Sequence, residues 1–340
     1  MTEPSERKRL LRRAAQVAVA MVFIGFLVWA VAGRWSEVKD VIGNLTIRAL
    51  VLSLLAALAA VWCTFMGWRA ILADFGHAVP IAGGMRIFFV GQLAKYLPGK
   101  VWPVVTQMKL GRGYDVPGRS SAAAVLIAML LALGTSLLVT VCVLPVLGDT
   151  AWAQYWWTLL VLPIAAVVLW PGILNALLSK AMKVLQREPM PRPLTGKGIA
   201  GSAVWLVLGW LLFGVHLWVL LLDLGATGSD LIVRSTGAFA GSWAIGFLLA
   251  VVPAGVGPRE VALVVLLGPA VGEPTALVAA VVSRLLMTAA DIIWPGVAVI
   301  VERRRQRSSI AGSARAKGAT ESVDDPPADG AQKFTSGGSG

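Results

Sequence analysis

Long hydrophobic runs alternate with short polar segments along almost the whole of this 340-residue chain. A helix of about 20 apolar residues is long enough to cross the roughly 30 Å of hydrocarbon in a bilayer. The runs of this kind are 14–33, 49–68, 120–147, 155–178, 199–222 and 275–301. The pattern therefore predicts an all-α polytopic membrane protein with six full transmembrane helices.

Two further hydrophobic stretches, 81–117 and 235–268, are interrupted by Pro and Gly within the segments KYLPGKVWP and VVPAGVGPRE. Pro breaks a helix, so each stretch is predicted to form a helical hairpin rather than one continuous helix. Non-helical backbone is tolerated at membrane depth only where protein or water covers its polar groups. The hairpin tips are therefore expected to line a cavity.

The basic residues between the runs predict an orientation. The N-terminus, the loop 180–197 and the segment after 301 are rich in Lys and Arg, whereas the loop 148–154 has neither. The positive-inside rule therefore places both termini and the loop 180–197 in the cytoplasm. Counting crossings then makes 81–117 a re-entrant hairpin from the cytoplasmic side and 235–268 one from the outer side. Such opposed pairs are typical of inverted-repeat transporters.

The same pattern divides the chain into three regions. Residues 1–13 are a basic cytoplasmic N-terminus, and residues 14–305 form the transmembrane domain. Residues 306–340 are poor in large apolar side chains, so they are expected to be a disordered cytoplasmic tail. The last four residues, GGSG, resemble an artificial linker.

The net charge of +12 does not indicate a nucleic-acid partner, because the basic residues flank the hydrophobic runs. The partner expected instead is the membrane and its lipids. The two histidines, His77 and His216, lie far apart in the sequence. We therefore predict no metal site and no cofactor, and His216 is expected to be a hydrogen-bonded core residue.

Two charged residues lie inside the last hydrophobic run. Arg284 and Asp291 are seven positions apart, so both project from one face of a helix, roughly 10 Å from each other. Ionisable groups at this depth normally face protein, a partner charge or water, and are candidates for function. Either Arg284 contacts substrate or a proton, or it forms a structural ion pair with the tip that carries Arg259 and Glu260. Asp291 could instead simply neutralise an arginine.

The interrupted segments carry further cations. Pro258 suits the first turn of a helix, whose N-terminus attracts anions. If the two tips face each other, Lys95, Lys100, Arg259 and Arg284 form a cationic pocket suited to a phosphate-bearing headgroup. The alternative for Lys95 and Lys100 is that they extend towards the membrane surface from a shallow hairpin.

The chain resembles the family of the transmembrane, flippase-like domain of lysylphosphatidylglycerol synthases. The resemblance covers residues 10–305 and rests on three motifs in order, GQ…YLPG, P-x-G-x-G-x-R-E and a final Arg followed by Pro and Gly. The matching residues are Gly91, Gln92, Tyr96, Pro98, Gly99, Pro253, Gly255, Gly257, Arg259, Glu260, Arg284, Pro295 and Gly296. Asp291 matches no position of this pattern. The form AKYLPGKVW resembles a bacterial branch, which implies the bacterial plasma (inner) membrane.

The resemblance implies that lipid is moved between leaflets. In the synthases this domain moves the aminoacylated lipid that a separate soluble domain makes, and stand-alone members are associated with other lipids or lipid-linked sugars. No soluble synthase domain is recognisable here, which argues against synthesis of lysylphosphatidylglycerol. A homodimer and partners from a glycosyltransferase pathway are compatible with this interpretation.

We therefore expect a lipid flippase, and not an enzyme, for an anionic phospholipid or a polyprenyl-phosphate-linked sugar. The predicted substrate-binding residues are Gln92, Lys95, Tyr96, Lys100, Trp102, Arg259, Glu260 and Arg284. Glu260 and Asp291 are predicted to form ion pairs or to exchange a proton. The alternatives are a membrane-embedded lipid phosphatase or transferase, for which the loops offer no cluster of catalytic groups, and a non-transporting accessory subunit.

Overall fold

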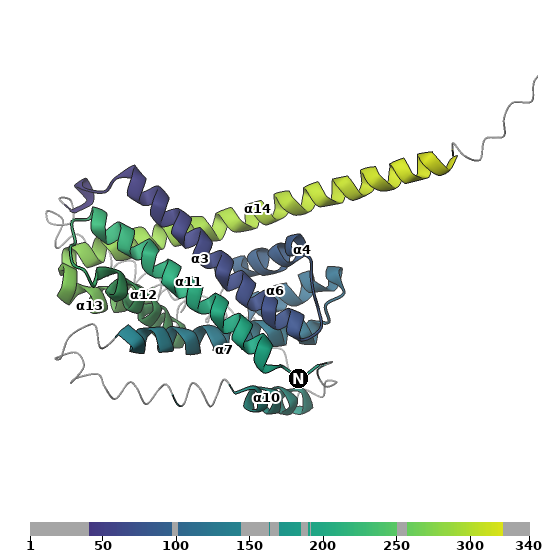
Figure 1. Ribbon diagram of the computed structural model, residues 1–340, viewed down its shortest axis with the longest axis horizontal. Coiled ribbons are helices and arrows are strands. Elements are labelled where there is room, and N and C mark those ends of the chain that lie inside the picture. Colours follow the sequence, from purple (N-terminus) through teal and green to yellow (C-terminus); the bar gives the residue numbers. More distant parts are fainter. Residues whose placement is uncertain are drawn as a thin grey trace, which may run out of the picture.

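The computed structural model describes residues 41–96, 101–143, 163, 170–184, 190, 192–249 and 257–321, with no side-chain description after 305. Every regular element within these ranges is a helix (Figure 1). Among the described residues, five helices are long and apolar enough to cross a membrane: α3 (Ile47–Asp74), α7 (Gly118–Val143), α11 (Gly196–Asp223), α12 (Leu231–Leu248) and the part Glu273–Arg305 of α14 (Glu273–Glu321). The chain is therefore an all-helical membrane protein.

Four of these helices coincide with predicted spans, while α12 forms the first arm of the predicted second hairpin. The predicted span 14–33 lies outside the described residues. The prediction of one continuous span over 155–178 is wrong. Trp170 is not helical, and a separate helix, α10 (Pro171–Val184), begins at the next residue. Proline cannot donate a backbone hydrogen bond, so it favours the first turn of a new helix over continuation of an old one.

The first hairpin consists of two antiparallel arms. Its first arm contains α4 (Ile81–Met85), the π-helix η1 (Arg86–Val90), α5 (Gly91–Leu93) and the 3-10 helix η2 (Ala94–Tyr96). Its second arm contains α6 (Trp102–Gly111) and the 3-10 helix η3 (Arg112–Tyr114). Gly91 faces Gln107 near the tip, and Gly83 faces Tyr114 near the base. Higher residue numbers in the first arm therefore face lower residue numbers in the second, as expected for antiparallel arms.

The second hairpin is built in the same way from α12 and α13 (Pro258–Val271). A Cβ added at Gly246 would lie 2.9 Å from the Arg259 Cβ, and one added at Gly241 would lie 3.3 Å from a methyl of Leu266. The absence of a side chain at these glycines is what allows the two helices to pack so closely. This hairpin is also antiparallel, with Arg259 near its tip.

The long helices α3 and α11 hold the two hairpins at opposite ends. Both are 28 residues long, and each is capped by the last residue of the other. Thr46 donates its backbone N–H and its hydroxyl to Asp223 at 2.6 and 2.9 Å. Thr195 donates the same two groups to Asp74, both at 2.7 Å. The first hairpin follows the end of α3 and the second follows the end of α11, so they begin from opposite ends (Figure 1).

Asp74→Ala and Asp223→Ala are expected to destabilise the protein to a similar extent. Each change removes two hydrogen bonds from the N-cap threonine of the partner helix, and lost caps typically cost about 1 kcal/mol. Each variant should therefore lower the thermal midpoint in detergent by about 2–4 °C, while Lys109→Ala on the exposed face of α6 should not change it. A clear loss in one Asp variant and none in the other would contradict the reciprocal arrangement.

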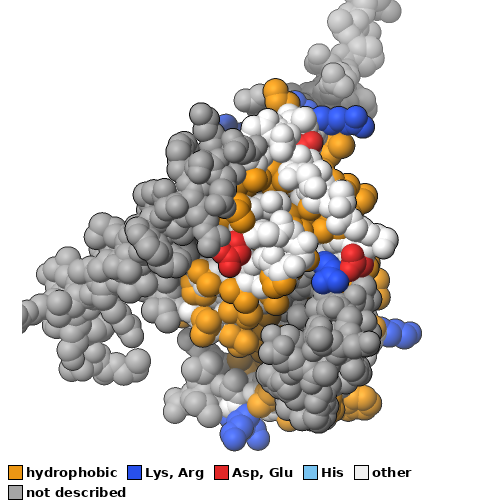
Figure 2. Space-filling model, turned by 90° about the vertical axis from the view of Figure 1, so that its left-hand side faces the viewer, with side chains coloured by type: hydrophobic (Ala, Val, Ile, Leu, Met, Phe, Trp, Pro, Cys, Tyr) orange, Lys and Arg blue, Asp and Glu red, His pale blue; other side chains and the backbone are white. Residues whose placement is uncertain are grey.

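Large hydrophobic side chains cover much of the outer surface. Leu55, Val204, Val265, Leu285 and Ile292 are each more than half exposed. Figure 2 views the end at which the second hairpin begins, where the described surface is mostly hydrophobic or uncharged with a few charged groups. Soluble monomers rarely expose such extended apolar patches, whereas a lipid environment favours them. The outer faces of the helices are therefore suited to contact lipid.

The last helix is longer than its hydrophobic run. α14 stays helical as far as Glu321 and projects beyond the other helices (Figure 1). The sequence predicted disorder from residue 306, and the helix found over 306–321 differs from that prediction. Ala is the commonest residue there, and it has the highest intrinsic helix propensity.

Candidate functional site

A cavity of about 570 Å³ lies where the two hairpins meet α3, α7, α11 and α14. This volume is in the range of small-molecule binding sites. Most of its wall is aromatic or aliphatic, and the aromatic members are Trp68, Phe88, Phe89, Trp210, Phe213, Phe239, Trp243, Phe247 and Trp294. Four charged residues also line it: Lys95, Arg259, Arg284 and Asp291. The cavity thus has an apolar wall and a charged centre.

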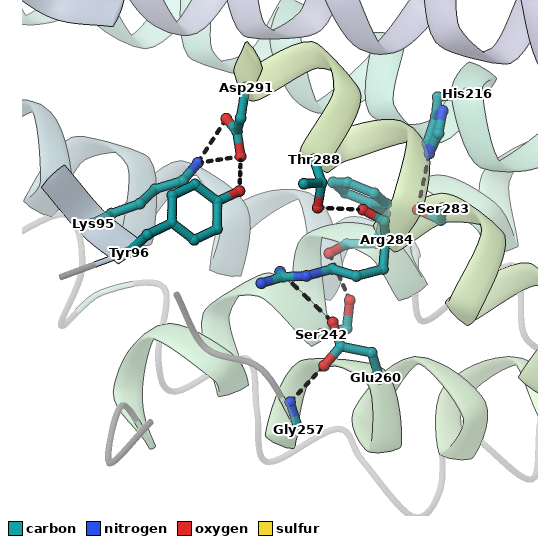
Figure 3. A network of polar contacts seen from close by, with 11 residues as sticks. Lys95, Tyr96, His216, Ser242, Gly257, Glu260, Ser283, Arg284, Thr288 and Asp291 are labelled. Atoms are coloured by element: carbon teal, nitrogen blue, oxygen red, sulfur yellow. Dashed lines mark hydrogen bonds and ion pairs between the residues drawn. The ribbon is translucent and has the colours of Figure 1, made fainter. Parts of the chain in front are cut away.

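Asp291 joins the tip of the first hairpin to α14 (Figure 3). The Nζ of Lys95 lies 2.7 Å from Asp291 Oδ1 and 2.6 Å from Oδ2, and the hydroxyl of Tyr96 donates to Oδ2 at 2.7 Å. The suggestion that Asp291 neutralises an arginine is corrected by this geometry, since its ion-pair partner is Lys95. Lys95 points into the cavity rather than only towards the membrane surface.

Glu260 joins the tip of the second hairpin to the same helix (Figure 3). Its Oε2 accepts the backbone N–H of Gly257 at 2.6 Å, and its Oε1 lies 3.7 Å from Nη1 of Arg284. Gly257 has a φ of 113°, a backbone conformation that favours glycine. The predicted ion pair between the last helix and the second hairpin is therefore present, and Glu260 also caps α13.

Arg259 differs from the other two cations that line the cavity in how its charge is balanced. Its guanidinium carbon lies 4.6 Å from the centre of the Phe239 ring, a cation–π contact. Among the described residues no carboxylate lies within ion-pair distance of Arg259, whereas Lys95 has Asp291 and Arg284 has Glu260. The described charged groups around the cavity therefore sum to one positive charge, carried by Arg259.

The structure places the other predicted site residues as follows. Gln92 lines the cavity, whereas Tyr96 is 39% exposed and reaches it only through Asp291. Trp102 begins α6 with 42% of its surface exposed and does not line the cavity. Lys100 lies in the segment 97–100, outside the described residues.

His216 has the structural position that the sequence predicted. It is fully buried and its Nδ1 and Nε2 lie 2.7 and 2.8 Å from the hydroxyls of Ser53 and Ser283. This hydrogen-bonded core residue links α11 to α3 and α14. Within the described ranges, no three His, Cys, Asp or Glu side chains form a group that could hold a metal ion.

The aromatic wall was missed by sequence reasoning, although the sequence contains a repeated aromatic pattern that includes part of it. Two clusters of three rings occur in the two halves of the described chain, with neighbouring centroids 5.1 and 5.2 Å apart in the first and 5.8 and 4.6 Å in the second. Their members are Trp62, Phe65 and Phe89, and then Trp210, Phe213 and Phe239. Each residue recurs 148 to 150 positions later, a spacing that the sequence alone contains.

Comparison with known proteins identifies the family but no individual relative. Residues 13–294 match the model of the lysylphosphatidylglycerol synthase TM region. Neither the curated proteins nor the solved structures gave a match. The matched segment includes both hairpins, α3, α7 and α11, and the part of α14 that carries Arg284 and Asp291. The chain therefore belongs to the family of the lysylphosphatidylglycerol synthase TM region.

Proposed function

We propose that this protein is a lipid flippase that moves an anionic, phosphate-bearing lipid between leaflets. The observation that carries the proposal is the excess positive charge of Arg259 inside a cavity formed by two opposed hairpins. A charge at membrane depth is costly unless it serves a ligand or a partner charge. An anionic headgroup in the cavity supplies that partner.

A phosphate suits this centre better than a carboxylate or a neutral group. Guanidinium groups bind phosphate oxygens through paired, charge-assisted hydrogen bonds. Arg259 and Arg284 both line the cavity, and Lys95 is held there by Asp291. Lys100 remains a predicted fourth cation. The lipid is an anionic phospholipid or a polyprenyl-phosphate-linked sugar whose chains leave the cavity towards the bilayer.

The mechanism we propose is alternating access by two inverted repeats. The reciprocal caps of α3 and α11 support it, as do the hairpins that begin from opposite ends of this pair. Residues 81–96 and 102–111 would rise only about 24 and 15 Å as helices, less than the roughly 30 Å of a bilayer core. These short arms favour a re-entrant form for the first hairpin. Rocking of one repeat against the other would expose the cavity to each side in turn.

The orientation in this proposal has both termini in the cytoplasm of a bacterial inner membrane. The base of the first hairpin carries Arg86 and Arg112, and the basic segment after α14 begins at Arg303. Both then lie on the cytoplasmic side, as the positive-inside rule requires. Of the two carboxylates predicted to exchange a proton, Asp291 is better placed, because it lines the cavity and Glu260 does not.

The test is a leaflet-exchange measurement with purified protein in lipid vesicles. Fluorescent phosphatidylglycerol in the inner leaflet should become accessible to a membrane-impermeant quencher faster than in protein-free vesicles. A lipid without phosphate, such as labelled diacylglycerol-linked galactose, serves as the comparison and should gain no acceleration that depends on Arg259. Wild-type protein that accelerates no phosphate-headed lipid would refute the flippase.

A lipid-modifying enzyme is the less favoured alternative. Two groups that such an enzyme could use are His77 and Asp74, but Asp74 caps α11. His77 Nε2 lies 3.1 Å from the Ser120 hydroxyl, and burial, Arg192 and Arg119 lower the pKa of His77. Ser120 is fully buried, so it is not placed to attack a lipid. Loss of lipid-phosphate turnover in His77→Ala would revive the enzyme.

A further inference from the structure

We propose that the cavity contains a neutral polar subsite for a hydroxyl-rich headgroup, formed by Trp68, Gln92 and Gln107. The inference rests on the proposed function, because it assumes that the phosphate occupies the charged centre. It adds the chemical class of the group attached to that phosphate, namely a polyol or a sugar ring.

The first observation is that buried polar atoms line the cavity without partners. Trp68 and Gln107 are each only 1% exposed, and neither the Trp68 Nε1 nor the Gln107 Oε1 has a hydrogen-bond partner among the described residues. Gln92, which is partly buried, lines the same cavity. Buried polar groups in folded proteins are nearly always hydrogen-bonded, so each exception asks for a missing ligand or water.

Position distinguishes these groups from other polar atoms that lack a partner in the described part of the chain. Tyr114, Ser121 and Ser202 also have such atoms, but none of these three residues lines the cavity. Trp68 and Gln107 both do, although they come from helices far apart in the sequence, α3 and α6. Both partnerless groups therefore face the same cavity.

The chain holds Gln107 in this place through Gly91. A Cβ added at Gly91 would lie 2.4 Å from the Gln107 Cγ, so only glycine leaves room for the glutamine side chain. Gln92 follows Gly91 directly, and Lys95 lies three residues further along the same arm. Residues three apart on a helix are neighbours on its surface. The neutral amides are therefore adjacent to the charged centre.

The chemistry of these side chains favours hydroxyl groups as the ligand. An amide both donates and accepts hydrogen bonds, and the indole N–H donates, while a hydroxyl can meet either kind of group. An acyl chain would leave all of them unsatisfied, at the cost of burying polar groups without partners. The rings of Trp68 and Phe88 beside the amides offer apolar faces to the C–H groups of a sugar or cyclitol.

The test compares two lipids that share one phosphodiester charge and differ in the headgroup, which is a hydroxyl-rich ring in one and a plain alkyl chain in the other. Labelled phosphatidylinositol and phosphatidylpropanol are placed in otherwise identical vesicles with the wild-type protein. Leaflet exchange of phosphatidylinositol is expected to be at least about tenfold faster, which corresponds to about 1.4 kcal/mol. Gln107→Leu should reduce this ratio to near one by slowing phosphatidylinositol alone. Ser121→Ala, which changes a partnerless hydroxyl away from the cavity, should leave both rates unchanged.

Failure of this inference is separable from failure of the flippase. Equal rates for both lipids in wild type, or equal slowing of both in Gln107→Leu, would overturn the subsite and leave phosphate transport standing. If neither lipid moves between leaflets, the subsite is tested by binding instead, through the amount of each lipid that the purified protein retains in native mass spectrometry. A preference for phosphatidylinositol that is lost in Gln107→Leu supports the subsite, and no preference overturns it. Gln107→Met, of similar length, replaces the leucine variant if that variant does not fold.

Discussion

Replacing Arg259 with Gln is expected to slow leaflet exchange of a phosphate-headed lipid by at least about 100-fold, which corresponds to the loss of about 2.7 kcal/mol of binding free energy. The reason is that Arg259 carries the charge left uncompensated among the described groups of the cavity. Because its removal leaves no described carboxylate without its partner, the thermal midpoint should change little. The measurement is the exchange rate in vesicles beside a thermal melt in detergent.

The matched control for this variant is Arg234→Gln. Arg234 belongs to the same hairpin but pairs with Asp230 at the start of α12, away from the cavity. Its exchange rate should stay close to that of wild type. A normal rate in the folded Arg259→Gln protein would remove the main support for phosphate binding, and an unchanged cellular phenotype in Arg259→Ala and Arg284→Ala would favour an accessory subunit.

Glu260→Ala is expected to destabilise the protein by about 3–5 kcal/mol, the usual cost of removing one partner from a buried ion pair. Glu260 is only 6% exposed and serves two groups, the N–H of Gly257 and the guanidinium of Arg284. Its loss therefore uncaps α13 and leaves Arg284 without this carboxylate. The thermal midpoint in detergent, followed by tryptophan fluorescence, measures the effect.

Two further variants separate the roles of Glu260. Glu260→Gln keeps an oxygen that can accept from Gly257 and loses only the charge, so it should lie between wild type and Glu260→Ala. The double variant Glu260→Ala/Arg284→Leu should regain part of the lost stability, because the guanidinium that had paired with Glu260 is removed as well. If Glu260→Ala melted like wild type, the coupling between the second hairpin and α14 would be wrong.

The sequence predicted the membrane helices well because that prediction needs only local information. The lengths of the runs that became α3, α7 and α11 were sufficient. The break at Pro171 was missed because the surrounding residues are hydrophobic on both sides. Hydropathy averages over such a window, whereas a single proline changes the backbone.

The charged centre was predicted only in part, because its pairings join distant positions. Lys95, Arg259 and Arg284 were predicted to share a cationic pocket, and Asp291 to lie on the same helix face as Arg284, but nothing local indicates that Lys95 meets Asp291. Gln107 was not singled out, since one amide in an amphipathic segment is ordinary. Its importance depends on the cavity and on the bare backbone of Gly91, both of which arise only in the folded chain.

The pairing of Lys95 with Asp291 also has a consequence for how the protein is made. The two residues are separated by 196 positions, and synthesis proceeds at about 5–20 residues per second. Lys95 thus enters the membrane roughly 10–40 seconds before its counter-charge exists. During this interval its ammonium group is best solvated by reaching towards the nearest membrane surface. The tip of the first hairpin therefore docks late in biogenesis, after α14 has been inserted.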